Sequence, residues 1–246
     1  YLNQHAGDGH YLSTVSPPLL TNYITGGSPL SFNDVTPLAV LGTEYVVLTV
    51  RADSPIKSGG DLVARLKKDP ASVAVGLSPG LGTHSHIGLA LAMKAVGVDA
   101  RKVRTVVFAA GSEAATALLG GHVELVSSTA GNVLPHIRAG KLRAIAVTAP
   151  QRVGGGLAEV PTWKEQGVAA VFSNWRGLIG PRGLSAAQIA YWDDVFAKLS
   201  QTGEWKKDLE NNSLEAVYLN SRETRKFLGA EHAQLKALLS ELGMAK

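Results

Sequence analysis

The chain has 246 residues, of which 45% are hydrophobic and 18% charged, so it can bury a core and is expected to be neither disordered nor a coiled coil. It has no cysteine, which excludes disulfides, cysteine-ligated metal centres and thiol catalysis. The 24 Lys and Arg against 20 Asp and Glu give a net charge of +4, but basic residues run no longer than pairs and only 6% of residues are aromatic, so nucleic-acid binding is not expected.

The middle of the chain alternates predicted strands with predicted helices. A strand-like stretch at 38–50 leads in; it is interrupted by Glu44, so no segment is expected to span a membrane. After it, strands are predicted at 73–75, 104–108, 123–126 and 142–147, with helices at 83–96, 113–119 and 132–139 between them. Strands and helices joined by short turns predict a mostly parallel sheet that is covered on both faces.

The two ends of the chain carry elements without local partners. Short strands are predicted at 178–179 and 217–219. A helix begins at the capping box Ser185-x-x-Gln188, and a last helix has Ser221 as its N-cap and closes at Gly243. The simplest packing joins both ends into one lobe, 1–45 plus 178–246, beside a second lobe, 46–177. The sequence therefore predicts an α/β protein of two lobes, joined by two crossings, with a cleft between them.

Three turns that follow predicted strands are rich in glycine and hydroxyl side chains: 76–85, 110–113 and 127–132. In a parallel sheet such turns share the edge formed by the carboxyl ends of the strands. A turn that enters a helix offers backbone N–H groups and the partial positive charge of the helix N-terminus, so the three together predict an anion site. Each turn taken alone is equally explained by helix capping. A similar turn at 13–18 is either a contribution from the other lobe or an ordinary turn ended by proline.

A serine-dependent α/β hydrolase is the alternative function. The stretch Gly-Leu-Ser-Pro-Gly at 76–80 matches the G-x-S-x-G motif with Ser78 as the nucleophile. However, Pro79 has no N–H at the position where the oxyanion hole needs one. Covalent labelling of Ser78 by a fluorophosphonate distinguishes this hypothesis from a binding protein.

Cofactor and metal sites are not expected. The stretch 80–85 only half matches the dinucleotide-binding glycine motif, because serine replaces its third glycine and the strand 104–108 has no acidic residue for a ribose. His84 and His86 are two residues apart at a helix start, where they point to different faces, and no third metal ligand has a suitable spacing.

Further motifs occur along nearly the whole chain in a specific order and spacing. They are Gly-Asp-Gly-His-Tyr-Leu at 7–12, Phe-Asn-Asp-Val-Thr-Pro-Leu-Ala at 32–39, Gly-Leu-Gly-Thr-His-Ser-His at 80–86, Leu-Gly-Gly-His-Val-Glu at 119–124, the stretches 135–147 and 160–167, Trp-Arg-Gly at 175–177 and Pro-Arg-Gly at 181–183. Together they resemble the periplasmic solute-binding receptors of tripartite tricarboxylate transporters, the Bug-type receptors.

This resemblance implies a type II-like Venus-flytrap fold and a binding protein that is not an enzyme. It implies a periplasmic monomer, its leader absent from this chain, that captures a small carboxylate and delivers it to membrane permease subunits. A sensory role stays open. The family opens with a strand, a loop and a helix before the 7–12 motif, and we expect this chain to begin after them. Carried over by position, the ligand-binding residues are Thr14, Ser16, Ser78, Gly80, Leu81, Gly82, Thr83, His84, Gly111, Ser112, Ser128 and Thr129.

Overall fold

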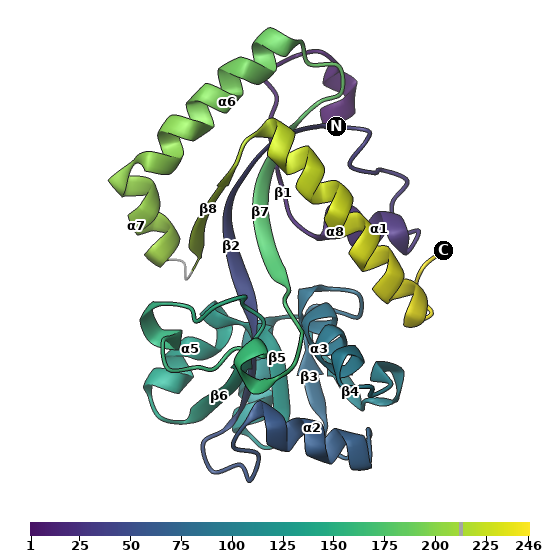
Figure 1. Cartoon of the computed structure of the whole chain (residues 1–246), viewed down its shortest axis with the longest axis vertical. Coiled ribbons are helices and arrows are strands. Elements are labelled where there is room, and N and C mark those ends of the chain that lie inside the picture. The colour runs from purple at the N-terminus through teal and green to yellow at the C-terminus, as the bar shows by residue number, and fades with distance from the viewer. Residues whose placement is uncertain (212–213) are drawn as a thin grey trace. The chain divides into compact units, whose positions relative to one another are not determined.

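The computed structural model describes residues 1–211 and 214–246 (Figure 1). They form two compact units, one of residues 1–44 and 174–246 and the other of residues 45–173. Both combine helices with strands, so the α/β fold class is confirmed. No helix among the described residues is both long and apolar enough to cross a lipid bilayer.

The unit of residues 45–173, here the second unit, contains a sheet with the strand order β4-β3-β5-β2-β6. Strand β3 pairs in parallel with β4 on one side and with β5 on the other, as the sequence predicts. The long strand β2 pairs with β5 and β6 in antiparallel fashion instead, because the chain enters this unit along β2 itself and not through a strand–helix–strand crossover. The elements of this unit are β2 (Thr36–Arg51, its second half), α2 (Gly59–Lys68), β3 (Val75–Leu77), α3 (His84–Ala95), β4 (Thr105–Val107), α4 (Gly111–Leu119), β5 (Leu125–Thr129), α5 (Ala130–Arg138) and β6 (Leu142–Val147), with short 3-10 helices at Ala100–Lys102, Gly155–Leu157 and Lys164–Gln166.

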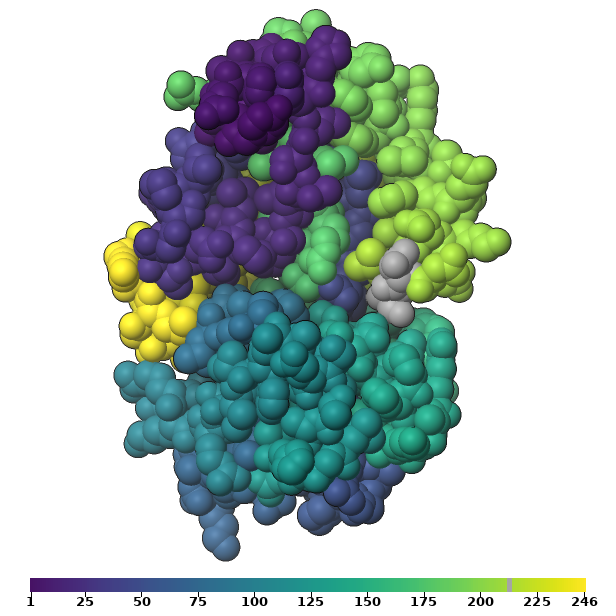
Figure 2. Space-filling model, turned by 180° about the vertical axis from the view of Figure 1, so that it is seen from behind, coloured from purple at the N-terminus to yellow at the C-terminus, as the bar shows by residue number. Residues whose placement is uncertain are grey.

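The first unit brings the two ends of the chain together. Its strands pair antiparallel: β1 with β7, and β8 with the first half of β2. Side chains of α6 fasten the N-terminal segment, since Gln188 Nε2 donates to the Gly7 carbonyl at 3.0 Å and Trp192 Nε1 to that of Gly9 at 2.9 Å; Figure 2 shows this purple segment beside light-green residues. The elements are a 3-10 helix (Leu2–His5), β1 (Ser13–Val15), α1 (Pro18–Ile24), β7 (Ser173–Gly180), α6 (Ala186–Gln201), α7 (Gly203–Asn211), β8 (Glu215–Leu219) and α8 (Ser221–Glu241).

Three details differ from the sequence prediction. Strand β5 extends to Thr129, so the predicted turn at 127–132 is the buried end of a strand followed at once by a helix. The N-cap of α8 is Asn220 and not Ser221, because the Asn220 side chain accepts the Glu223 N–H while the Glu223 carboxylate accepts the Asn220 N–H. Helices α1, α2 and α7 lie in segments where the sequence analysis predicts no helix.

Candidate ligand-binding site

Three helices of the second unit begin at one edge of its sheet. Because β4 and β5 both run parallel to β3, the carboxyl ends of the three strands share that edge. Strand β3 leads to α3 through residues 78–83, β4 leads to α4 through residues 108–110, and β5 leads to α5 with no residue between them. The starts of α3, α4 and α5 therefore lie on one side of the unit, as the sequence predicts.

These three helix N-termini have no side-chain cap among the described residues. Thr83 and Thr129 occupy N-cap positions, but the Thr83 hydroxyl donates to the Gly80 carbonyl at 2.6 Å, and Thr129 Oγ1 accepts from Asn132 Nδ2 at 3.2 Å. By contrast, α2, α6 and α8 each begin with a complete capping box. An N-terminus without a side-chain cap keeps its partial positive charge available to an anion.

The three N-termini are not equivalent. Helix α4 has Glu113 in its first turn, and this carboxylate accepts the Ala109 N–H at 3.2 Å. Neither α3 nor α5 has an acidic residue in its first turn. An added negative charge is therefore attracted more strongly to α3 and α5 than to α4.

A chain of buried serines fixes the turn before α3. The Ser85 hydroxyl donates to the Ser78 carbonyl at 2.7 Å, and the Ser127 hydroxyl of β5 donates to the Ser85 carbonyl at 2.7 Å. All three serines are buried. The start of α3 is thus bonded to the neighbouring strand, which holds its first turn at the sheet edge.

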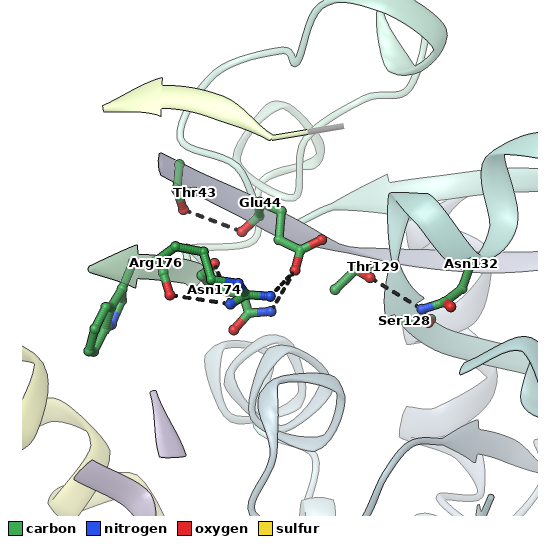
Figure 3. A network of polar contacts seen from close by, with 8 residues as sticks. Thr43, Glu44, Ser128, Thr129, Asn132, Asn174 and Arg176 are labelled. Carbon is green, nitrogen blue, oxygen red and sulfur yellow. Dashed lines mark hydrogen bonds and ion pairs between the residues drawn. The ribbon is translucent and has the colours of Figure 1, made fainter. Parts of the chain in front are cut away.

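Asn132, at the start of α5, lies close to the start of α4 and is not among the predicted site residues. Its Nδ2 donates to Ser128 Oγ at 3.0 Å and to Thr129 Oγ1 at 3.2 Å (Figure 3). A Cβ atom on Gly111 would lie 2.3 Å from the same Nδ2, so only glycine lets α4 begin this close to Asn132. The one sequence signal for Asn132 is its spacing, three and four residues after two hydroxyl side chains.

Gly82 and His86 form the last contact of this turn. Gly82 has a φ of 77°, in the left-handed region that favours glycine, and its N–H donates to His86 Nδ1 at 3.1 Å. Burial of the imidazole lowers the pKa of His86. Because Nδ1 accepts, the neutral ring carries its proton on Nε2. His86 thus has a structural partner, and the described residues contain no group of three acidic, histidine or cysteine side chains suited to a metal ion.

We expect the stability of the protein to fall on mild acidification because of His86. Its pKa is lower in the folded chain than the value near 6.5 of an unfolded histidine, so the unfolded state binds the extra proton first. Above about pH 6.5 the ring is neutral in both states and the free energy of unfolding is unaffected. As the pH falls from there toward the lowered pKa, the free energy of unfolding decreases, in total by roughly 1.4 kcal/mol for each unit between the unfolded and the folded pKa. Urea unfolding at several pH values measures this loss. In His86→Gln the slope between pH 5 and 7 should be smaller; an unchanged slope would contradict the assignment.

The other predicted site residues differ in their exposure to solvent and in which of the two units contains them. Leu81 is 51% exposed at the tip of its turn, and Ser112 is exposed at the start of α4. Ser78 is only 3% exposed, so its hydroxyl is poorly placed for the nucleophilic role of the alternative hypothesis. Thr14 is exposed on β1, and the Ser16 carbonyl accepts the Leu19 N–H at 3.0 Å before α1. Both belong to the first unit, and their contribution to the site stays a prediction.

A partly buried polar network lies in the first unit, where the two chain segments leave it. Glu44 is its last residue on β2, and Asn174 is its first residue on β7. Glu44 Oε1 accepts from Asn174 Nδ2 at 2.9 Å and from Arg176 Nη2 at 2.5 Å (Figure 3). This network, which the sequence analysis does not predict, ties the two crossing strands together.

A family model described as the tripartite tricarboxylate transporter family receptor matches residues 1–244. The chain belongs to this family of receptors. The receptor is 31% identical over 243 residues to a protein encoded in the gbd 5′ region of Cupriavidus necator, covering 98% of this chain and 72% of that protein. It is 26% identical to BugT of Bordetella pertussis, covering 97% and 73% of the two chains. The predicted family is therefore confirmed.

Solved structures confirm the fold of the receptor. A TctC solute-binding protein from Polaromonas, solved without ligand, superposes with a TM-score of 0.84 at 26% identity, covering 97% of this chain and 81% of that one. The R. palustris protein Rpa4515, solved with adipate, superposes with a TM-score of 0.81 at 23% identity, covering 100% and 82%. These neighbours are consistent with the predicted periplasmic-binding-protein fold class.

Proposed function

We propose that this receptor captures a small carboxylate at the sheet edge where α3, α4 and α5 begin. The observation that carries the proposal is that three neighbouring helix N-termini have no side-chain cap among the described residues, whereas α2, α6 and α8 have complete ones. Carboxylate oxygens accept hydrogen bonds from such N-termini and are stabilised by the helix dipoles.

The residues of the site have distinct proposed roles. Gly82 and Gly111 let the backbone come close to the ligand and to Asn132. The Thr83 and Ser112 side chains border it, and the buried Ser128 holds the start of α5 in place. Gly80, Leu81, His84 and Thr129 complete the proposed lining.

A dicarboxylate is the ligand class we favour. Rpa4515, which shares the fold, was solved with adipate, a linear dicarboxylate. The N-termini of α3 and α5 have no acidic residue in their first turns. Two such N-termini can bind two carboxylate groups, which favours a dicarboxylate over a monocarboxylate. As a member of a transporter receptor family, the protein is proposed to work outside the cytoplasm as a monomer, without catalysis, and to deliver the acid to membrane permease subunits.

Titration calorimetry and thermal unfolding with a panel of adipate, malate, succinate and citrate test this function. A ligand present at 100 times its Kd stabilises the folded state by about 2.7 kcal/mol, which raises the Tm of a chain of this size by roughly 5–10 °C. Adipamide, which has the same length as adipate and no charge, is the matched control and should have no effect. Equal responses to adipate and adipamide, or no response to any acid in the panel, would refute the proposal.

A further inference from the structure

A cavity lies within the first unit, beside the packing contact of α1 with α8. Its volume is about 440 Å³, within the range of small-molecule sites. Tyr23 and Ser28 line it from α1 and the following turn, His232 and Lys236 line it from α8, and Lys246 completes the wall. The Lys246 N–H donates to the Ile24 carbonyl at 2.9 Å, which fixes that residue against the end of α1.

The charged side chains in this wall are all basic. Lys236, Lys246 and His232 line the cavity, and no aspartate or glutamate does so. Within residues 1–211 and 214–246, neither lysine ammonium group has an ion-pair or hydrogen-bond partner. Glu231, next to His232 in the chain, does not line the cavity, and burial raises its pKa to about 7. Among the side chains that line the cavity, the two lysine charges therefore have no opposite charge to balance them.

His232 reports on this positive charge. Its ring centroid lies 6.0 Å from that of Tyr23 and 5.7 Å from that of Phe32, so the imidazole is in contact with two aromatic rings. Burial lowers the pKa of His232, and the charge of Lys236 lowers it further. An anion in the cavity would oppose the second effect and favour the protonated ring.

A neutral hydrogen-bond donor is also present. Ser28 Oγ accepts the Leu30 N–H at 3.2 Å, which leaves the Ser28 O–H as a donor. An oxygen atom of a ligand can therefore meet a hydroxyl as well as two ammonium groups, a combination suited to an oxyanion with several acceptor oxygens.

We propose that this cavity is a second binding site, for a small oxyanion with two negative charges. Lys236 and Lys246 neutralise the two charges, and Ser28 and His232 donate hydrogen bonds. None of these residues belongs to the proposed carboxylate site, and all of them lie in the first unit. Phosphate and short dicarboxylates share the required chemistry, and the experiment below separates these two sources.

Nuclear magnetic resonance of the histidine ring carbons tests the site on the full chain. At constant ionic strength, millimolar inorganic phosphate or succinate should raise the pKa of His232 by about 1, since an opposite charge within 4–6 Å produces shifts of this size. A response to phosphate alone assigns a phosphate-type ligand, and a response to succinate alone assigns a dicarboxylate. His10, which is exposed and paired with Asp8, provides the internal reference.

Two lysine variants make the test specific. Lys236→Met keeps the aliphatic stem and removes the charge. It should raise at least tenfold the anion concentration that is needed to shift the pKa of His232. Lys141→Met removes an exposed charge from the second unit and should leave the response unchanged. Gly82→Val should also leave it unchanged, which separates this site from the carboxylate site. No response to either anion, or an equal response in Lys236→Met, would overturn the proposal.

Discussion

Gly82→Val is expected to weaken carboxylate binding by at least 100-fold. With a φ of 77°, residue 82 adopts a backbone conformation that a β-branched side chain strongly disfavours. Relief of this strain moves the turn and breaks the bond from the Gly82 N–H to His86 Nδ1. The first turn of α3 then no longer presents its N–H groups to the ligand. A 100-fold loss corresponds to about 2.7 kcal/mol of binding free energy.

Gly97→Val is the matched control for this variant. Gly97 has a φ of 75°, follows the opposite end of α3, and has no atom within 4 Å of an added Cβ. The two variants should therefore lose similar stability, about 1–3 kcal/mol each, through the same backbone strain. Calorimetry with the best acid of the panel measures the difference in affinity. If Gly97→Val binds as poorly as Gly82→Val, the loss reflects stability and not the site.

Local signals predict the sheet edge at which the three turns lie. The turns before α3 and α4 follow short apolar strands and contain glycine and hydroxyl residues, and the start of α5 follows the same pattern. Parallel pairing of β3, β4 and β5 then places the turns at one edge by topology alone. What the pattern does not specify is the end of β5, because Ser127 and Ser128 resemble turn residues although they are buried in a strand.

Helix α2 shows why another part of the fold was not predictable. Its capping box, Ser58 with Asp61, is visible in the sequence, but Gly59 and Gly60 fill the first turn and lower the helix propensity. A Cβ atom on Gly59 would lie 2.6 Å from the ring of Trp163, about 100 residues away in the chain. Tertiary packing against Trp163 therefore requires glycine at position 59, although in the local sequence this glycine indicates a loop.

The network around Glu44 depends on long-range contacts in the same way. Its hydrogen bonds join Glu44 to residues 130 and 132 positions later. A single glutamate in an apolar strand gives no indication of such partners, and in the sequence it indicates only that the stretch does not span a membrane. The pairing becomes visible once β2 and β7 are known to leave the first unit together.

Glu44→Ala is expected to lower the free energy of unfolding by about 3 kcal/mol. Asn174 is only 3% exposed, so its amide loses an acceptor that water does not easily replace. The Arg176 side chain is 43% exposed and can be solvated again, which keeps the cost below that of breaking a fully buried ion pair. Glu44→Gln retains an acceptor oxygen in a side chain of the same shape and should cost about 1 kcal/mol. Urea unfolding followed by circular dichroism measures both.

A double-mutant cycle with Asn174→Ala tests whether the hydrogen bond causes the loss. If Glu44 stabilises the chain through Asn174, the two substitutions together should cost less than the sum of their separate effects, by about 1 kcal/mol or more. Simple additivity would show that Glu44 acts elsewhere. Glu44 and Asn174 are the residues at which β2 and β7 leave the first unit. A coupling energy between them would therefore also show that the two strands stabilise each other at that point.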